Sequence, residues 1–402
     1  MIGCKESLSR KDRPPDRQRE TGFTLIEMLV SLVVLVAIIA IVFSVTQETS
    51  KAWTNTTGKI EGFRNARTAF DAMSRTLSQA TLNTYYDYAY VNGGSLKFVP
   101  LGNSTLPTTY ARNSDLQIIS GQGATLLTGI TGYSAVTHAI FFQAPLGQVS
   151  PANSSSLGDL DKLLNACGFY VVYGPDFATP TFLPGAPKRY RYRLIQFAQP
   201  SDNLSVYVAG NKGTSNWYLP FIQSDATAAT AIPSTPPTSN FTLAENIIAL
   251  IIEPKLSLKD EMAADATYGI NTASTPLGTA LAPNYAYDSS TPGQGGTLSA
   301  SGASSRPMLN SLNQLPPVVQ VTMVALDEAS AMKLGNTTAA PNALLGLNAT
   351  LFTEAKNFQA DLQTLKDNLS ATPGNAAQNK MKLNFRVFQT EVAIRGAKWT
   401  SN

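Results

Sequence analysis

The chain contains a single histidine, His138, and a side chain of this type could act as a general base or as a metal ligand. It lies in the run Val-Thr-His-Ala-Ile-Phe-Phe, which predicts a strand, and no nucleophile or second ligand accompanies it in the sequence. With one His and two Cys in 402 residues, the chain has little material for His-dependent or metal-dependent chemistry. We therefore predict a structural histidine, with no catalytic residue, no cofactor and no bound metal.

Carboxylates could instead bind calcium. Asp327 and Glu328 are adjacent, and Glu245 and Glu253 lie elsewhere in the chain. None of them shows the spacing of an EF-hand loop. We interpret Asp327 and Glu328 as part of a solvated turn.

Three arginines, Arg189, Arg191 and Arg193, alternate with Tyr190 and Tyr192. A strand here would have one basic and one aromatic face. It could bind DNA, or it could be an exposed edge strand that its charge protects from pairing. The chain has 30 Lys and Arg against 27 Asp and Glu, a net charge of +3, which is too balanced for a protein that grips phosphates. We favour the protected edge and expect no nucleic-acid partner.

Glu27 has the most unusual setting of any ionisable residue. The segment from Phe23 to Val45 has 23 residues, no Gly or Pro, and Glu27 as its single charge. As a helix it would be roughly 34 Å long, enough to cross a hydrocarbon core of about 30 Å. Basic residues are concentrated ahead of it, and only Lys51 and Lys59 follow closely, so the positive-inside rule keeps the N-terminus in the cytoplasm.

Three interpretations of this apolar segment compete. A cleaved secretory signal would have a shorter apolar region and a small-x-small site after it. A plain membrane anchor fits the length but does not explain Glu27. Inserting a carboxylate into the middle of a membrane helix raises the free energy by about 2.5–3.5 kcal/mol. Such an acid therefore usually has a partner and a function.

The residues around Glu27 indicate which partner this is. Residues 21–30, Thr-Gly-Phe-Thr-Leu-Ile-Glu-Met-Leu-Val, resemble the type III signal of the type IV pilin and type II secretion pseudopilin superfamily. The resemblance implies that a prepilin peptidase cuts between Gly22 and Phe23 on the cytoplasmic face and N-methylates Phe23. The new α-amine would lie one helical turn from Glu27. In a filament, Glu27 of one subunit would neutralise the Phe23 amine of its neighbour, where an unpaired charge would be costly.

This signal divides the chain into four parts. They are a cytoplasmic leader at 1–22, a transmembrane helix at 23–46, an amphipathic continuation of that helix at 47–84, and a β-rich domain outside the inner membrane at 85–402. Cys4 would leave with the leader, so Cys167 would remain alone and no intramolecular disulfide could form.

Periodicity in the rest of the chain predicts an α+β fold, with the long N-terminal helix packed on an antiparallel sheet. An apolar stripe from about 60 to 82 repeats at steps of three and four residues: Phe63, Ala66, Phe70, Met73, Leu77 and Ala80. Predicted strands are Leu96–Val99, Leu116–Ile119, Ala139–Phe142, Phe169–Tyr173, Tyr190–Phe197, Ile247–Ile252, Val318–Leu326 and Leu383–Ile394. A further helix is predicted at Thr353–Leu369, with Ala355, Phe358, Leu362, Leu365 and Leu369 on one face.

Narrower resemblances concern the domain after the helix. Residues 67–80, 190–200 and 315–328 resemble J-type minor pseudopilins, and the ending at 385–400 resembles the large prepilin-like cassette proteins of Verrucomicrobia. The chain is longer than typical J-type members. We assign the excess to loop insertions near 224–240 and 289–307, which are rich in Thr, Ser, Gly and Pro.

These observations predict a non-enzymatic structural subunit, a minor pseudopilin-like protein of a type II secretion or type IV pilus-like filament. Its partners would be a prepilin peptidase, other pseudopilin or pilin subunits, and an inner-membrane assembly platform. It would be a single-pass inner-membrane protein with a periplasmic C-terminal domain, reaching a filament or the cell surface after assembly. The alternative is a membrane-anchored cell-surface binding protein that carries this signal without joining a secretion filament. A third possibility, an exported hydrolase, would require a catalytic His138.

Overall fold

The computed structural model describes residues 24–92, 95–97, 106–130, 132–157, 160, 162–175, 188–207, 217–222, 240–291, 309, 311–345, 347, 350–370 and 382–399. The chain divides into two compact units, Met1–Thr57 and Gly58–Asn402. The predicted leader at 1–22, including Cys4 and Gly22, lies outside the described residues, as does Phe23. Most of the two predicted insertions also lies outside them.

Helix α1, Leu25–Ser78, is the only helix in the described part of the chain that is long and apolar enough to cross a membrane. Its large apolar side chains from Leu25 to Val45 are 51% to 83% exposed. No residue of this segment contributes to the protein core. The segment therefore presents unburied apolar surface on every side, as expected for a helix that a bilayer or other apolar helices would cover.

The second half of α1 forms part of the core of the second unit. The predicted stripe is confirmed, because Ala66, Phe70, Met73, Leu77 and Ala80 are all buried. The helix itself ends at Ser78, earlier than the predicted boundary at 84. The chain leaves the helix there because the Ala80 N–H bonds the carbonyl of Leu77 at 3.0 Å, and the Thr81 N–H then bonds the carbonyl of Gln143 at 2.9 Å.

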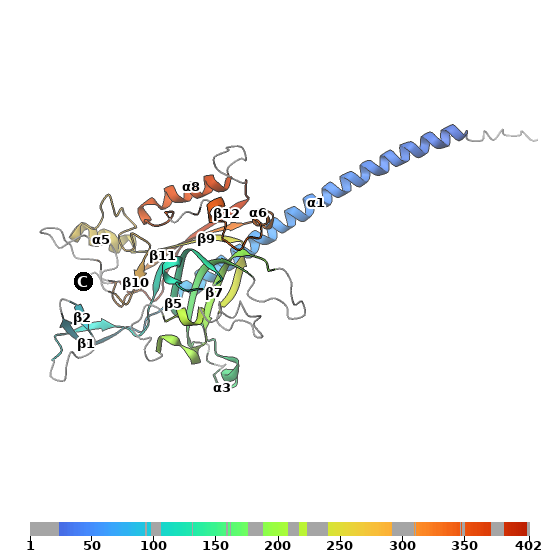
Figure 1. The fold of residues 1–402 in the computed structure, drawn as a ribbon. Helices are drawn as coiled ribbons and strands as arrows, with labels where there is room; N and C mark the ends of the chain where they lie inside the picture. The colour runs from blue at the N-terminus through green and yellow to red at the C-terminus, as the bar shows by residue number, and fades with distance from the viewer. Residues whose placement is uncertain are drawn as a thin grey trace, which may run out of the picture. The chain divides into compact units, whose positions relative to one another are not determined.

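The larger sheet is antiparallel and has six strands in the order β10-β4-β5-β6-β7-β8 (Figure 1). Their bounds are Tyr287–Asp288, Ile119–Gln122, Ser134–Pro145, Leu164–Gly174, Arg191–Gln199 and Asn240–Glu245. The central strand β6 is buried along almost its whole length, because side chains on both of its faces enter the core. This explains its unbroken apolar run in the sequence.

A second antiparallel sheet has the order β12-β11-β9, with bounds Phe385–Ala393, Val318–Leu326 and Ile247–Lys255 (Figure 1). The strand predicted at Val318–Leu326 is confirmed residue for residue. The second half of α1 packs on this sheet, since the rings of Phe70 and Phe388 lie 5.9 Å apart. The α+β fold class is therefore confirmed.

A third, small sheet has the order β2-β1-β3, with bounds Ser95–Lys97, Tyr85–Asn92 and Thr109–Asn113. Short helices complete the fold: α2 Gly123–Leu126, α3 Ser154–Leu157, α5 Leu258–Tyr268, α6 Glu328–Lys333, α7 Asn342–Leu345 and α8 Phe358–Ser370. Single 3-10 turns occur at Pro151–Asn153, Ser201–Asn203, Ser205–Tyr207 and Ala355–Asn357. The predicted helix at Thr353–Leu369 thus begins at Phe358, and its predicted apolar face is buried.

One predicted strand is wrong in its position. The strand predicted at Leu116–Ile119 begins only at Ile119. The N–H groups of Gln117 and Ile118 donate instead to side chains, the Oε1 of Gln143 and the Oγ of Ser289, both at 3.0 Å. Ser289, which the sequence assigned to an insertion, is buried and belongs to the fold.

Candidate functional site

The N-terminal end of α1 holds Glu27 in a defined arrangement with Thr24. The Thr24 backbone N–H and hydroxyl both donate to Oε2 of Glu27, at 2.9 and 2.8 Å. The Glu27 N–H in turn approaches the Thr24 hydroxyl oxygen at 3.4 Å. This is a capping box, in which a Thr and a Glu three residues later satisfy N–H groups that a helix start leaves free.

The capping box fixes where the Glu27 carboxylate lies. It lies against the backbone nitrogen of Thr24, which is the second residue after the predicted cleavage position between Gly22 and Phe23. Thr24 was not recognised as a site residue from the sequence. Its signal was present as the spacing Thr-x-x-Glu at the start of an apolar run.

His138 is structural in its contacts. It is completely buried, its Nδ1 accepts the N–H of Ile252 at 3.0 Å, and its Nε2 lies 2.9 Å from the carbonyl of Phe352. Burial lowers its pKa to about 4, and the contact with the Phe352 carbonyl opposes this only in part. The ring therefore has no free nitrogen to offer a substrate or a metal.

The interpretation of Asp327 and Glu328 as a solvated turn is wrong for Asp327. Asp327 is fully buried and caps helix α6, accepting the N–H of Ser330 at 2.7 Å. It also accepts a hydrogen bond from Asn384 at 3.0 Å. The sequence Asp-Glu-Ala-Ser begins a helix here, because Asp is a favoured N-cap residue.

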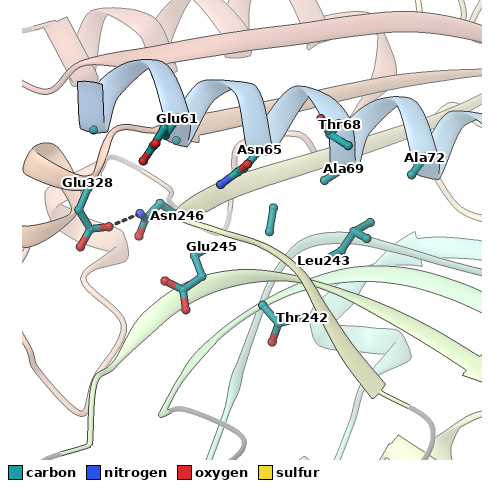
Figure 2. Close-up of a pocket in the computed structure, with 13 residues that line it drawn as sticks. Glu61, Asn65, Thr68, Ala69, Ala72, Thr242, Leu243, Glu245, Asn246 and Glu328 are labelled. Carbon is teal, nitrogen blue, oxygen red and sulfur yellow. Dashed lines mark hydrogen bonds between the residues drawn. The ribbon is translucent and has the colours of Figure 1, made fainter. Parts of the chain in front are cut away.

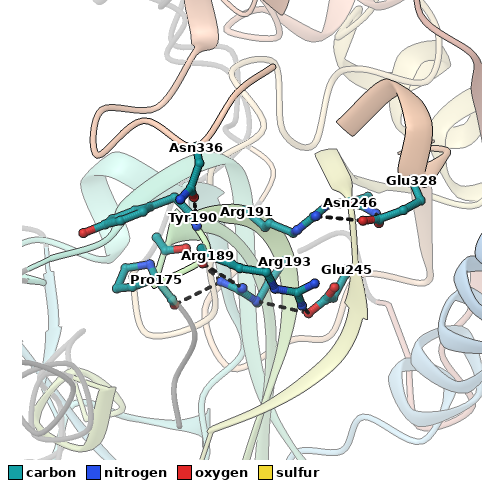
Figure 3. Close-up of polar contacts among 10 residues, drawn as sticks. Pro175, Arg189, Tyr190, Arg191, Arg193, Glu245, Asn246, Glu328 and Asn336 are labelled. Atoms are coloured by element: carbon teal, nitrogen blue, oxygen red, sulfur yellow. Dashed lines mark hydrogen bonds and ion pairs between the residues drawn. The ribbon is translucent and has the colours of Figure 1, made fainter. Parts of the chain in front are cut away.

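The interpretation of the arginine strand as a protected edge is also wrong. Strand β7 pairs with β6 on one side and with β8 on the other. Arg193 is 2% exposed and donates to the carbonyls of Gly174 and Pro175 at 2.8 and 3.0 Å (Figure 3). A buried guanidinium keeps its charge, so it requires such acceptors.

Carboxylates neutralise the same arginines (Figure 3). Glu245 lies 3.7 Å from Arg193 and 3.6 Å from Arg189, and Glu328 lies 2.7 Å from Arg191. The predicted basic face is therefore paired with acids from β8 and α6. This pairing leaves little positive potential for binding phosphate groups.

Glu253 is the buried acid with the most perturbed environment. It is 2% exposed, and its Oε2 lies 3.4 Å from the ammonium of Lys255. Burial raises its pKa to about 7, against the opposing effect of Lys255. Within the described ranges, no three His, Cys, Asp or Glu residues are grouped so that they could hold a metal ion.

A groove of about 620 Å³ runs between the second half of α1 and strand β8, and we call it the α1–β8 groove (Figure 2). Its lining comes from Gly58, Glu61, Gly62, Asn65, Thr68, Ala69, Ala72, the β8 segment 242–245, Asn246 and Glu328. It contains no catalytic constellation. It does bring together Glu245 and Glu328, two of the acids considered for calcium, but Arg193 and Arg191 of β7 contact them.

Comparison with known proteins gives one result for the N-terminal segment. Residues 17–43 match the family model described as "Prokaryotic N-terminal methylation motif". The match includes Gly22, Phe23, Thr24 and Glu27. Neither the curated proteins nor the solved structures compared with the chain gave a match.

Proposed function

We propose that this chain is a prepilin-type structural subunit, cut between Gly22 and Phe23, methylated on Phe23 and anchored by the first half of α1. The observation that carries this proposal is the methylation motif at residues 17–43. The exposed apolar surface of α1 from Leu25 to Val45 supports it, since such a helix must be covered by lipid or by similar helices.

The capping box gives Glu27 a specific task in this proposal. In the uncut chain, the carboxylate accepts two hydrogen bonds from Thr24. Cleavage would create a cationic amine on Phe23, the residue next to Thr24. The carboxylate could then pair with the Phe23 amine of a neighbouring subunit, and the pairing would fix the axial position of the two helices in an apolar surrounding.

The domain after the helix suits a minor component better than a major one. Its two larger sheets and surrounding helices form a large body that would be difficult to repeat along a tightly packed fibre. We therefore propose a role as a minor pseudopilin-like subunit of a type II secretion or type IV pilus-like filament, in keeping with the resemblance to J-type members. Its partners would be a prepilin peptidase, sibling pseudopilins or pilins, and an inner-membrane assembly platform.

A second candidate function is a membrane-anchored cell-surface binding protein that uses the same processing signal. The α1–β8 groove favours this candidate, because it is a recessed surface within the second unit. Co-purification separates the two functions. A filament subunit should be recovered with sibling pseudopilins after mild crosslinking, and a surface binding protein should not.

Processing can be tested directly by mass spectrometry. The full chain is expressed together with a prepilin peptidase, and the N-terminal peptide is identified. We expect N-methylated Phe23 at the mature N-terminus of the wild type and an uncut leader in Gly22→Val, whereas the control Thr21→Ser should be processed normally. A mature N-terminus at any other residue would contradict the proposal.

A further inference from the structure

We propose that the α1–β8 groove binds an extended, basic peptide segment of a partner protein, which adds to β8 as a further strand. This inference concerns the second unit alone and does not depend on how the anchor is processed. Three features support it: an unpaired sheet edge, a space of suitable length, and an uncompensated acid in the wall.

Strand β8 is the last strand of the six-stranded sheet. It pairs with β7 on one side, from Asn240 to Glu245. On its other side, no backbone group of 241–245 bonds to any residue that the structure describes. A free strand edge has alternating N–H and C=O groups that can pair with an incoming strand.

Except for Glu61, the residues of α1 that line the groove are small or medium-sized. Gly58 and Gly62 line the groove. Ala69 and Ala72 line it further along the helix, and Asn65 and Thr68 are the larger side chains between them (Figure 2). From Gly58 to Ala72 the helix rises by roughly 21 Å at 1.5 Å per residue. A strand rises by about 3.3 Å per residue, so the groove has room for about six residues in extended conformation.

The charge of the lining decides which kind of segment fits. The lining contains three acids, Glu61, Glu245 and Glu328, and no Lys or Arg. The charges of Glu245 and Glu328 are already paired with Arg193 and Arg191 of β7. Glu61 projects from α1 toward the groove and forms no ion pair with any described residue (Figure 2). A Lys or Arg side chain of the bound segment would complete this pair.

A second groove provides a built-in comparison. It lies on α1 beside the free edge of β12, has a similar volume of about 610 Å³, and is lined by Arg67, Asp71, Arg75 and residues 387–390. Its charged residues are two bases and one acid, so it has no preference for a cationic peptide. The inference therefore predicts binding at one groove and not at the other.

The test measures peptide binding to the full chain in detergent micelles by fluorescence anisotropy. The probe is a dye-labelled peptide, Lys-Thr-Val-Thr-Val-Thr-Lys, with blocked ends. Two control peptides have Glu in place of Lys, or N-methyl groups on alternate backbone nitrogens. Two protein variants fill one groove each: Thr68→Trp fills the α1–β8 groove and Gln389→Trp fills the β12 groove, and both replaced side chains are exposed.

We expect the Lys peptide to bind the wild type and Gln389→Trp equally, and to bind Thr68→Trp at least tenfold more weakly. Glu61→Gln should weaken binding about two- to fivefold, because it removes a single, partly exposed ion pair between Glu61 and a Lys of the peptide. The Glu peptide and the N-methylated peptide should both bind at least tenfold more weakly than the probe. Equal binding of all three peptides, or full binding to Thr68→Trp, would overturn the inference. Self-association of the chain that Thr68→Trp abolishes would also overturn it, because the occupant would then be a second copy.

Discussion

The Nδ1 atom of His138 accepts a hydrogen bond of 3.0 Å from the backbone N–H of Ile252. His138 belongs to β5 and Ile252 to β9, so this bond joins the two larger sheets. It forms at a bulge in β5, where the neighbouring Thr137 has φ 56° and its hydroxyl oxygen accepts the Leu250 N–H at 2.9 Å. Two side chains of a distorted strand thus satisfy the free edge of β9.

This bond requires a neutral imidazole. Because Nδ1 is an acceptor, the ring proton lies on Nε2, which donates to the carbonyl of Phe352 at 2.9 Å. A protonated ring would donate at both nitrogens, and the bond to Ile252 would be lost. In the folded protein the imidazole of His138 therefore resists protonation. Burial acts in the same direction and lowers its pKa from 6.5 to about 4.

The first prediction concerns His138→Ala. We expect it to lower the free energy of unfolding at pH 7 by about 3 kcal/mol, because the Ile252 N–H loses its acceptor and a fully buried ring is replaced by a cavity, whereas the Phe352 carbonyl keeps its bond from Gln122 at 2.6 Å. The unfolded chain gains the proton first, so the contribution of His138 is complete above pH 6.5 and is lost as the pH falls toward 4. Urea denaturation of wild type and variant across this range should show the difference narrowing toward low pH. A difference that stays constant would mean that the histidine does not titrate as described.

The second prediction concerns Glu253→Gln. The pKa of Glu253 is raised from 4.5 to about 7, so the unfolded chain loses its proton first and stability falls as the pH rises through this range. The Gln variant avoids the cost of a buried carboxylate. We expect it to be more stable than wild type at pH 8, by on the order of 2 kcal/mol, and close to wild type at pH 4.5. Lys255 would keep its 2.6 Å bond to Gln320. A variant less stable than wild type at pH 8 would show that the Lys255 ion pair outweighs burial.

Much of the core was predictable because its periodicity is local. The helix stripe that includes Phe70 and Met73, the strand Val318–Leu326 and the buried face of α8 all follow from apolar residues at helical or strand spacing. Strands β1 and β3 were not predicted, although the alternating tyrosines of Tyr85–Asn92 are typical of a strand.

The errors arose where a polar residue has a partner that is distant in the sequence. Arg193 looked like a surface charge, but Gly174 and Glu245 compensate it inside the sheet. Asp327 looked solvated; its N-cap bond to Ser330 is local and typical of Asp at a helix start, but its bond from Asn384 spans 57 residues of sequence. No single-sequence pattern reveals such pairings. In the candidate site, Thr24 could have been identified from the capping-box spacing alone.

The third prediction concerns glycine packing. A Cβ on Gly168 would clash with the ring of Phe141 and lie 2.9 Å from the Ile140 carbonyl oxygen. We expect Gly168→Ala to destabilise the second unit by about 2–3 kcal/mol, because neither neighbour can move freely in a packed sheet. The matched control is Gly58→Ala, where nothing lies within 4 Å and the residue is helical. That variant should be neutral or more stable by up to about 1 kcal/mol, as measured by denaturation midpoint. Equal effects of the two changes would contradict the close packing of β5 on β6.

The fourth prediction separates the two roles of Glu27, the helix cap and the charge. Glu27→Gln retains a side-chain oxygen that can accept from Thr24, so it preserves the cap and removes only the charge. Thr24→Ala removes the Thr24 hydroxyl and keeps the charge.

If Glu27 pairs with the Phe23 amine of a neighbour, Glu27→Gln and Glu27→Leu should be inserted and cleaved normally but should be recovered with sibling subunits at least tenfold less than wild type. Thr24→Ala should co-purify almost as well as wild type, because an N-cap contributes only about 1 kcal/mol. The opposite pattern, with normal assembly of Glu27→Gln and poor assembly of Thr24→Ala, would show that Glu27 acts only as a cap.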